Sequence, residues 1–242
     1  MIKYDITSLE KGCKELGLDL SDRQVVQFVK FYELLVEWNK VMNLTGITEY
    51  EEVISKHFLD SLLMVKAYDI NQADSIIDIG TGAGFPGIPL KIVFPEKKFV
   101  LLDSLGKRIK FLDAVVDNLG LQQIELIHGR AEDYAKKEEY REQFDLAVSR
   151  AVANLSSLSE YCIPFVKLGG AFVPYKSGSI DEELKQSEKA VSILGGKRMA
   201  CKELLLPDTD ITRTFILIEK VKHTSKKYPR KAGLPAKEPL GQ

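Results

Sequence analysis

A cluster of glycines between two buried apolar runs limits the possible folds of this chain more than any other feature. The stretch SIIDIGTGAGFPGIPLKIVFPEKKFVLLDS covers residues 75–104, and its two apolar runs each carry an aspartate at the exit, Asp78 and Asp103. Two strand-length runs separated by a glycine turn and a short helical segment are typical of a βαβ unit. Glycines at such a turn let the backbone bend tightly and approach a ligand, while the following helix offers free N–H groups. We therefore expect a ligand site where the first strand turns into its helix.

Apolar runs and amphipathic stretches continue to alternate along the rest of the chain, at residues 106–120, 124–128, 144–149, 154–166, 169–175 and 181–196. Residues 196–207 and 213–221 are strand-like and have no helix between them, which indicates a hairpin at the end of the sheet. Repeated βαβ units followed by a hairpin predict an α/β, Rossmann-like fold with a mostly parallel sheet of seven strands.

The pattern divides the chain into three regions. Residues 1–70 show helical periodicity, with Ser21 as the N-cap of a helix, and we expect this extension to cover one side of the sheet. Residues 71–222 hold the sheet and its helices. Residues 223–242 contain three prolines and little periodicity, so we expect an extended C-terminal tail.

The spacing of the glycines fits two kinds of ligand. Gly82, Gly84 and Gly87 match the G-x-G-x-x-G fingerprint for nicotinamide dinucleotides, which leaves an NAD-dependent oxidoreductase as an alternative. Asp78 favours another ligand, because a carboxylate beside the turn would repel a pyrophosphate but attract an ammonium group. S-adenosylmethionine carries an ammonium group and a sulfonium and has no phosphate. Asp103 suits either ligand, since it can accept hydrogen bonds from ribose hydroxyls.

Further candidate contacts to this ligand lie in the glycine turn and after the third strand. Gly80 and Phe85 belong to the glycine turn, and the turn HGRAED places backbone groups of Ala131 and Glu132 where they could read an adenine edge. Taken alone, Glu132 also fits a first-turn acid that complements a helix dipole, and Phe85 also fits core packing.

A second group of candidates lies at the end of the fourth strand, which reads FDLAVSRAVANL. Arg150 lies there, with Arg130 and Lys176 at the ends of neighbouring strands, and three cations suit phosphate groups or a carbonyl oxygen. They are poor general bases, which fits an acceptor that already has a lone pair, such as N7 of guanine. Catalysis would then consist mainly of positioning two reactants. An ion pair with Asp145 or Glu132 is a purely structural alternative for Arg150.

Composition and charge limit the classes of function. No apolar run reaches the roughly 18 residues that span a bilayer, the N-terminus lacks a signal-peptide pattern, and the three scattered cysteines form neither a disulfide framework nor a zinc site. The three histidines form no set, and we expect His57 to support helix packing. These features predict a cytoplasmic protein without a metal or a membrane anchor.

The net charge of −1 hides an asymmetry. Residues 220–242 hold seven basic residues and one acid, so this segment carries +6 and the remainder of the chain −7. Such a tail predicts an anionic partner, although a merely solvated tail would have the same composition.

Several motifs together resemble one known family. They are WNKVMNLTGIT, KHFLDSL, DIGTGAGFPGIPLKI, LLDSLGKRIKFL, GRAED, SRAVANL, VPYKSG and KYPRKAGLPAKEPL, and they run from the N-terminal helices to the tail. The chain resembles the small-subunit ribosomal RNA guanine-N7 methyltransferase family, RsmG, also called glucose-inhibited division protein B (GidB). The resemblance implies a class I S-adenosylmethionine-dependent methyltransferase fold. It also implies methyl transfer to N7 of a single guanine of 16S rRNA, guanine 527.

The resemblance implies roles for particular residues as well. Contacts to S-adenosylmethionine are expected from Gly80, Phe85, Ala131, Glu132 and Arg150. Substrate positioning is expected from Arg130, Arg150 and Lys176. The expected partner is 16S rRNA or the small ribosomal subunit, bound by a monomer, and the basic tail with Tyr228 suits an RNA backbone with an unstacked base nearby. A non-catalytic RNA-binding module with the same fold is a further alternative.

Overall fold

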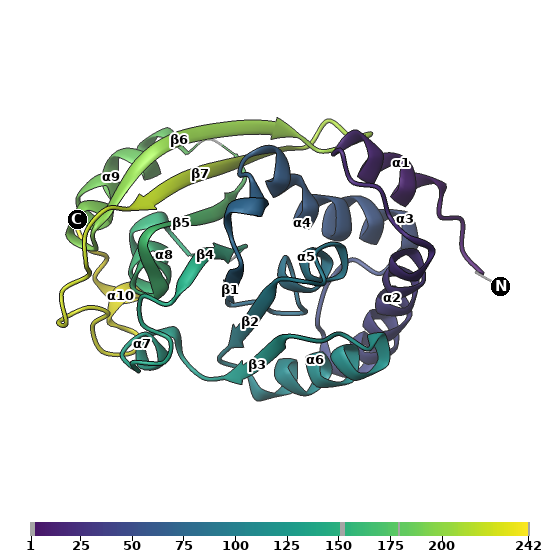
Figure 1. Ribbon diagram of the computed structural model, residues 1–242, viewed down its shortest axis with the longest axis horizontal. Coiled ribbons are helices and arrows are strands. Elements are labelled where there is room, and N and C mark those ends of the chain that lie inside the picture. The colour runs from purple at the N-terminus through teal and green to yellow at the C-terminus, as the bar shows by residue number, and fades with distance from the viewer. Residues whose placement is uncertain (1–2, 151–152, 179, 242) are drawn as a thin grey trace.

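A seven-stranded sheet forms the centre of the molecule in a computed structural model that describes residues 3–150, 153–178 and 180–241 (Figure 1). The strands lie in the order β3-β2-β1-β4-β5-β7-β6, with β1 to β5 parallel and β7 antiparallel to both of its neighbours. They span Ser75–Ile79 (β1), Lys98–Asp103 (β2), Ile124–His128 (β3), Phe144–Ser149 (β4), Val166–Lys176 (β5), Gly196–Leu205 (β6) and Thr212–Lys220 (β7). The mostly parallel sheet of seven strands is confirmed, and so is the terminal hairpin of β6 and β7.

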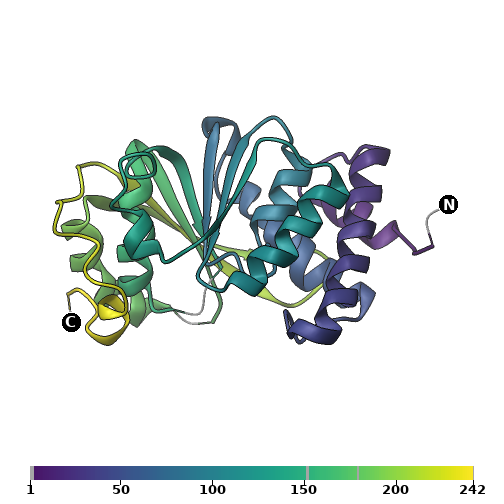
Figure 2. The ribbon, with the colours of Figure 1, turned by 90° about the horizontal axis from the view of Figure 1, so that it is seen from below.

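Helices cover both faces of the sheet (Figure 2). One face carries α1 (Thr7–Glu15), α2 (Asp22–Met42), α3 (Tyr50–Val53), α4 (Asp60–Leu62), α5 (Gly87–Val93) and α6 (Gly106–Leu119). The other carries α7 (Ala131–Tyr134), α8 (Leu155–Cys162), α9 (Asp181–Ile193) and α10 (Leu234–Lys237). Because side chains alternate along a strand, Ile76 packs into the first core and Ile77 into the second. Among the described residues, no helix has both the length and the apolar character that crossing a bilayer requires.

The N-terminal helical layer follows from local sequence signals. Ser21 caps α2 through a capping box, as predicted. The helix ends at Asn43, whose φ of 50° is left-handed, and the Asn39 side chain then accepts two backbone hydrogen bonds from the loop. Helical structure resumes from Tyr50 to Lys66 and includes a π-helical turn over Ile54–Leu59. Turns of this kind are frequent at functional sites, and this one lies near the carboxyl ends of the strands.

The C-terminal segment packs on the second helical face, and the prediction of an extended tail is wrong. Tyr228 is buried, and the Arg230 guanidinium binds the fully buried carboxylate of Glu160 on α8 at 2.7 Å. The Arg141 guanidinium donates to carbonyl oxygens of the segment, including that of Tyr228 at 2.9 Å. These contacts are individual polar anchors without periodicity, so no pattern in the sequence indicates them.

Candidate functional site

Two cavities adjoin at the carboxyl ends of the parallel strands. The smaller, about 290 Å³, lies over the glycine turn; this turn cavity is lined by Leu44, Thr45, His57, Gly80, Thr81, Gly82, Ala83, Phe85, Arg108 and Arg150. The larger, about 630 Å³, is called the arginine cavity; its charged and imidazole side chains are Lys56, His57, Asp60, Arg150, Lys176, Glu183 and Arg213. His57 and Arg150 line both cavities, so they form a shared wall.

Both aspartates at the strand ends brace the glycine turn. Asp78 Oδ2 accepts hydrogen bonds from Thr81 Oγ1 at 2.7 Å and from the Gly87 N–H at 2.9 Å. Asp103 Oδ2 accepts one from the Gly82 N–H at 2.9 Å. Glycine is required here because φ is 63° at Gly82, and because a Cβ at Gly87 would lie 2.9 Å from Asp78 Oδ2. The two acids therefore shape the backbone that lines the turn cavity.

Asp78 lies behind the turn and lines neither cavity. Its side chain is fully buried, and this burial raises the pKa of the carboxyl group to about 7, against the lowering effect of the hydrogen bonds from Thr81 and Gly87. The second oxygen, Oδ1, is buried and has no hydrogen-bond partner among the described residues. If Asp78 contacts a ligand directly, as expected, Oδ1 is the atom that remains to accept a hydrogen bond from it.

Asp103 lies behind the glycine turn and is only 2% exposed. Besides the bond from Gly82, its Oδ2 receives a hydrogen bond from Arg108 Nη1 at 3.2 Å, and its Oδ1 one from the Leu105 N–H at 2.9 Å. Arg108 itself lines the turn cavity. A hydroxyl group that binds Asp103 would thus do so beside a cation.

The shared wall is built around His57. Its imidazole stacks on Phe85 with ring centres 4.5 Å apart, and the Arg150 guanidinium carbon lies 5.0 Å from the Phe85 ring centre. Arg150 Nη2 lies 3.3 Å from His57 Nδ1, and His57 Nε2 lies 2.8 Å from Thr45 Oγ1. Nδ1 also lies 3.1 Å from the carbonyl oxygen of Lys56, so this nitrogen faces both a donor and an acceptor. Burial and the charge of Arg150 lower the pKa of His57 to about 4, so the ring is neutral at pH 7.

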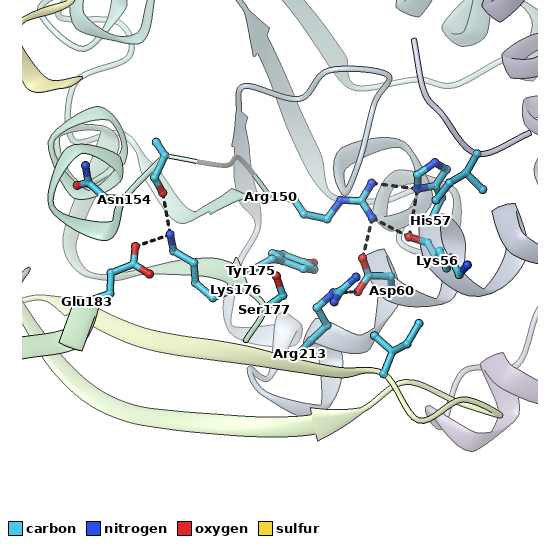
Figure 3. Close-up of a pocket in the computed structure, with 13 residues that line it drawn as sticks. Lys56, His57, Asp60, Arg150, Asn154, Tyr175, Lys176, Ser177, Glu183 and Arg213 are labelled. Atoms are coloured by element: carbon cyan, nitrogen blue, oxygen red, sulfur yellow. Dashed lines mark hydrogen bonds and ion pairs between the residues drawn. The ribbon is translucent and has the colours of Figure 1, made fainter. Parts of the chain in front are cut away.

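Asp60 joins two arginines in the arginine cavity (Figure 3). Its Oδ2 accepts from Arg150 Nη1 at 2.8 Å, and its Oδ1 accepts from Arg213 Nε at 2.7 Å. Across the cavity, Lys176 Nζ donates to Glu183 Oε1 at 2.6 Å and to a backbone carbonyl oxygen at 2.7 Å. Both acids that line this cavity are thus paired with cations.

The structure gathers only part of the predicted site at the cavities. The predicted residues that line one of them are Gly80, Gly82, Phe85, Arg150 and Lys176. Asp78 and Asp103 support the turn from behind.

The turn after β3 lies outside both cavities. Ala131 and Glu132 begin α7 and are buried, and Glu132 Oε1 accepts a hydrogen bond from the Gly233 N–H of the C-terminal segment at 2.9 Å. Arg130 is exposed just beyond the carboxyl end of β3, but β2 and β1 separate this strand from β4, which Arg150 follows. Glu132 therefore anchors the C-terminal segment, and Arg130 faces solvent some distance from the shared wall.

Several lining residues reach the site from elements that the sequence does not link to it, namely Thr45, His57, Asp60, Arg108 and Arg213. The packing role predicted for His57 is incomplete, because its ring is also part of the shared wall. Arg150 pairs with Asp60 and not with Asp145 or Glu132. The motif KHFLDSL, which holds His57 and Asp60, is the one signal that could have indicated both. Within the described part of the chain, no group of three or more histidine, cysteine or acidic side chains could hold a metal ion.

Comparison with protein families identifies close relatives. The family model described as GidB, rRNA small subunit methyltransferase G, matches residues 24–212. A Lachnoclostridium phytofermentans protein named ribosomal RNA small subunit methyltransferase G is 55% identical over 236 residues, which are 98% of each chain. A protein of the same name from Alkaliphilus metalliredigens is 51% identical over 232 residues, which are 96% of this chain and 97% of that one.

Solved structures resemble the chain in fold. The O-methyltransferase from Bacillus cereus, in complex with SAH, superposes with a TM-score of 0.57 and 17% identity over 89% of this chain and 98% of that chain. TYW2 of M. jannaschii, in complex with AdoMet, gives a TM-score of 0.50 and 13% identity over 62% of this chain and 70% of that chain. The likeness shows a Rossmann-like, class I methyltransferase fold, as predicted.

Proposed function

This chain belongs to the GidB family, rRNA small subunit methyltransferase G, and on this premise we propose that it transfers a methyl group from S-adenosylmethionine to N7 of one guanine of 16S rRNA. The observation that carries the proposal is the wall of His57 and Arg150 shared by the turn cavity and the arginine cavity. A transfer between two substrates requires the reactants to lie side by side, and two adjoining cavities meet that requirement.

The turn cavity fits the methyl donor. Its glycine turn leaves room for close approach of a ligand, and Asp78 Oδ1 lacks the hydrogen-bond donor that an ammonium group would supply. Asp103, behind the turn, is the acceptor that we propose for the ribose hydroxyls, and Phe85 offers an apolar surface in the cavity. We propose that Gly80, Gly82, Phe85 and Arg150, which line the cavity, bind the donor together with Asp78 and Asp103 behind the turn. Ala131 and Glu132 line neither cavity, so their contacts to the donor rest on the family resemblance alone.

An NAD-dependent oxidoreductase fits the chain less well. A pyrophosphate at the turn would lie close to the carboxylate of Asp78, which has no cation paired with it among the described residues. The glycine spacing also has a packing explanation, because a Cβ at Gly84 would lie 2.6 Å from Ile88 Cγ1. The relatives that match nearly the whole chain are named as methyltransferases.

The arginine cavity fits an acceptor that needs no deprotonation. Asp60 and Glu183 are held in ion pairs, and the low pKa of His57 makes the ring a weak base. N7 of guanine has a lone pair available at neutral pH, and Arg150 and Lys176 suit its neighbouring O6 or a phosphate.

Positioning is therefore the main contribution of the chain to catalysis. The bound donor supplies an electrophilic methyl carbon on a positively charged sulfur. The shared wall sets the distance between the two reactants, because His57 and Arg150 border both cavities. Stacking on Phe85 and the bond to Asp60 hold Arg150 in place, so this group is ordered before the RNA arrives. Arg130 would act at a greater distance, as a contact to the RNA backbone.

The exposed cations of the C-terminal segment suit the RNA backbone. Lys226, Lys227 and Lys231 are all exposed, whereas Tyr228 is buried and does not offer a face for stacking an unstacked base. Removing the segment after Lys222 would also remove buried contacts, so deletion does not isolate an effect on RNA binding. We propose that the protein acts as a monomer in the cytoplasm, on 16S rRNA or the small ribosomal subunit.

Mapping the methylated nucleotide tests the proposed function. Unmodified 16S rRNA and small subunits are incubated with the protein and methyl-labelled S-adenosylmethionine, and the label is located by cleavage at 7-methylguanosine. We expect one labelled guanine, modified at N7. No transfer to either substrate would favour the non-catalytic RNA-binding alternative, and label at another atom would contradict the assignment of the acceptor.

A further inference from the structure

Two guanidinium groups share one carboxylate in the wall of the arginine cavity. Asp60 is 1% exposed, and its two oxygens accept hydrogen bonds from Arg150 and from Arg213. The other acid of the cavity, Glu183, is paired with Lys176. Among the described residues, neither arginine has an ion pair with any acid except Asp60. The cluster therefore carries one positive charge in excess.

The negative charge of Asp60 accounts for the presence of only one of the two arginines beside it. A buried carboxylate needs a single cation, and Arg150 already supplies one from a side chain that is 19% exposed. Arg213, 21% exposed, adds a second charge that is costly to desolvate unless an anion meets it. This surplus indicates that an anionic group from outside the chain completes the cluster.

The hydrogen bonds of Arg213 leave one amino group of its guanidinium, Nη2, available. Nε is fixed on Asp60, and Nη1 lies 3.3 Å from the carbonyl oxygen of Thr212. Nη2 makes no hydrogen bond within the described part of the chain. Figure 3 shows this guanidinium turned toward Asp60, whose carboxylate lies between it and the guanidinium of Arg150. A guanidinium that is held through Nε and Nη1 and has Nη2 without a partner in the described part of the chain is already oriented for a phosphate oxygen.

We propose that Arg213 binds a phosphate group of the RNA substrate in the arginine cavity, and that Asp60 is the positioning residue that orients Arg213 and Arg150 for this contact. The proposal rests on the proposed function and deepens it, because it names a phosphate-binding residue on β7, outside the strands that carry the predicted cations. A phosphate held there fixes the nucleotide relative to the shared wall.

Binding and turnover of Arg213→Gln, Asp60→Asn and the double variant test this proposal. With 16S rRNA as substrate, we expect Arg213→Gln to raise KM for the RNA about tenfold and to change kcat less than threefold. The slope of log affinity against log salt should fall by about 0.7–0.9, the loss of one phosphate contact. Asp60→Asn should raise the same KM, and the double variant should bind RNA no more weakly than the weaker single variant.

Two controls separate this effect from a loss of folding. Asp145→Asn removes an ion pair with Lys167 near the amino end of β4, away from the cavities at the carboxyl ends, and should leave KM for the RNA unchanged. If Asp60→Asn fails to fold, Arg213→Lys replaces it as a test. This variant keeps the charge and should retain the salt slope while weakening RNA binding, because a lysine ammonium lacks the rigid planar fork by which Asp60 orients Arg213 toward the phosphate.

Opposite results would overturn the phosphate contact. An unchanged salt slope in Arg213→Gln would show that Arg213 contacts no phosphate. Losses of RNA affinity that add up in the double variant would show that Asp60 does not act through Arg213. RNA binding by the wild-type protein without any methyl transfer would instead contradict the proposed function, and the binding data would still decide on Arg213.

Discussion

Single acidic residues hold the backbone of the glycine turn that lines the turn cavity. Asp78 and Asp103 were predicted from charge as ligand contacts, and the structure shows that both also hold the turn by hydrogen bonds. Charge patterns in a sequence indicate where acids gather. They do not indicate which carboxylate oxygen accepts a hydrogen bond from a backbone N–H, because this depends on a turn geometry that only the folded chain has.

Gly87→Ala tests the bracing of the turn. The new Cβ would lie 2.2 Å from Leu101 Cδ2 and 2.9 Å from Asp78 Oδ2, so the turn has to shift. We expect a loss of about 1–3 kcal/mol in the free energy of unfolding, measured by denaturant titration, and weaker binding of S-adenosylhomocysteine. Gly46→Ala is the matched control, since its Cβ would meet nothing within 4 Å. Equal stability of the two variants would contradict the bracing role.

His57 predicts a dependence of stability on acid pH. Its pKa in the folded protein, about 4, is below the ordinary value of 6.5. Between these values the unfolded chain binds a proton that the folded chain does not, so stability falls as the pH drops below 6.5. His57→Asn removes this titration, and the advantage of wild type over the variant should shrink by about 2 kcal/mol from pH 7 to pH 5. A pH-independent difference between their unfolding free energies would refute the buried, neutral imidazole.

At the scale of elements, regular structure could be predicted and irregular anchoring could not. The strands Ser75–Ile79 and Lys98–Asp103 form in the two apolar runs of residues 75–104, as predicted, because buried parallel strands are short, continuous apolar runs bounded by turns. The C-terminal segment has no such period. Its position depends on Arg230, Arg141 and Glu132, each of which meets a partner far away in the sequence.

Arg230→Ala tests how the C-terminal segment is held. The substitution leaves the fully buried carboxylate of Glu160 without its cation, which costs about 3–5 kcal/mol in a buried pair. We expect a matching loss of stability and faster proteolysis after residue 224. Arg198→Ala removes the exposed pair with Glu188 and should cost less than about 1 kcal/mol. An Arg230 variant as stable and as protease-resistant as the Arg198 variant would show that the segment is held by other contacts.

The whole molecule brings the N-terminal layer and the sheet together around one site. Thr45, His57 and Asp60 come from the helical extension, which was predicted only to cover the sheet. Contacts between residues far apart in the sequence do not show in spacing or periodicity. The sequence therefore indicates Arg150 as a site residue but not His57, the other residue of the shared wall. The family resemblance, in contrast, predicted fold and activity from motifs along nearly the whole chain.

The charge asymmetry of the molecule predicts where RNA binds. N- and C-terminal regions lie at opposite ends (Figure 2), so exposed lysines at the two ends can be compared. We expect replacement of Lys226 and Lys227 by alanine to weaken rRNA binding and to reduce the salt slope by about 1.4. Replacement of Lys14 and Lys30, which are also exposed, removes the same charge from the other end and should change neither value. Equal effects of the two double variants would indicate a general charge effect.

Calorimetric titration with S-adenosylhomocysteine and, in parallel, with NAD tests most directly whether the braced glycine turn forms the methyl-donor site. We predict one molecule of S-adenosylhomocysteine bound per chain, weaker binding to Gly87→Ala, and no heat of binding with NAD. Saturable binding of NAD, lost in Gly87→Ala, together with no binding of S-adenosylhomocysteine would contradict the account.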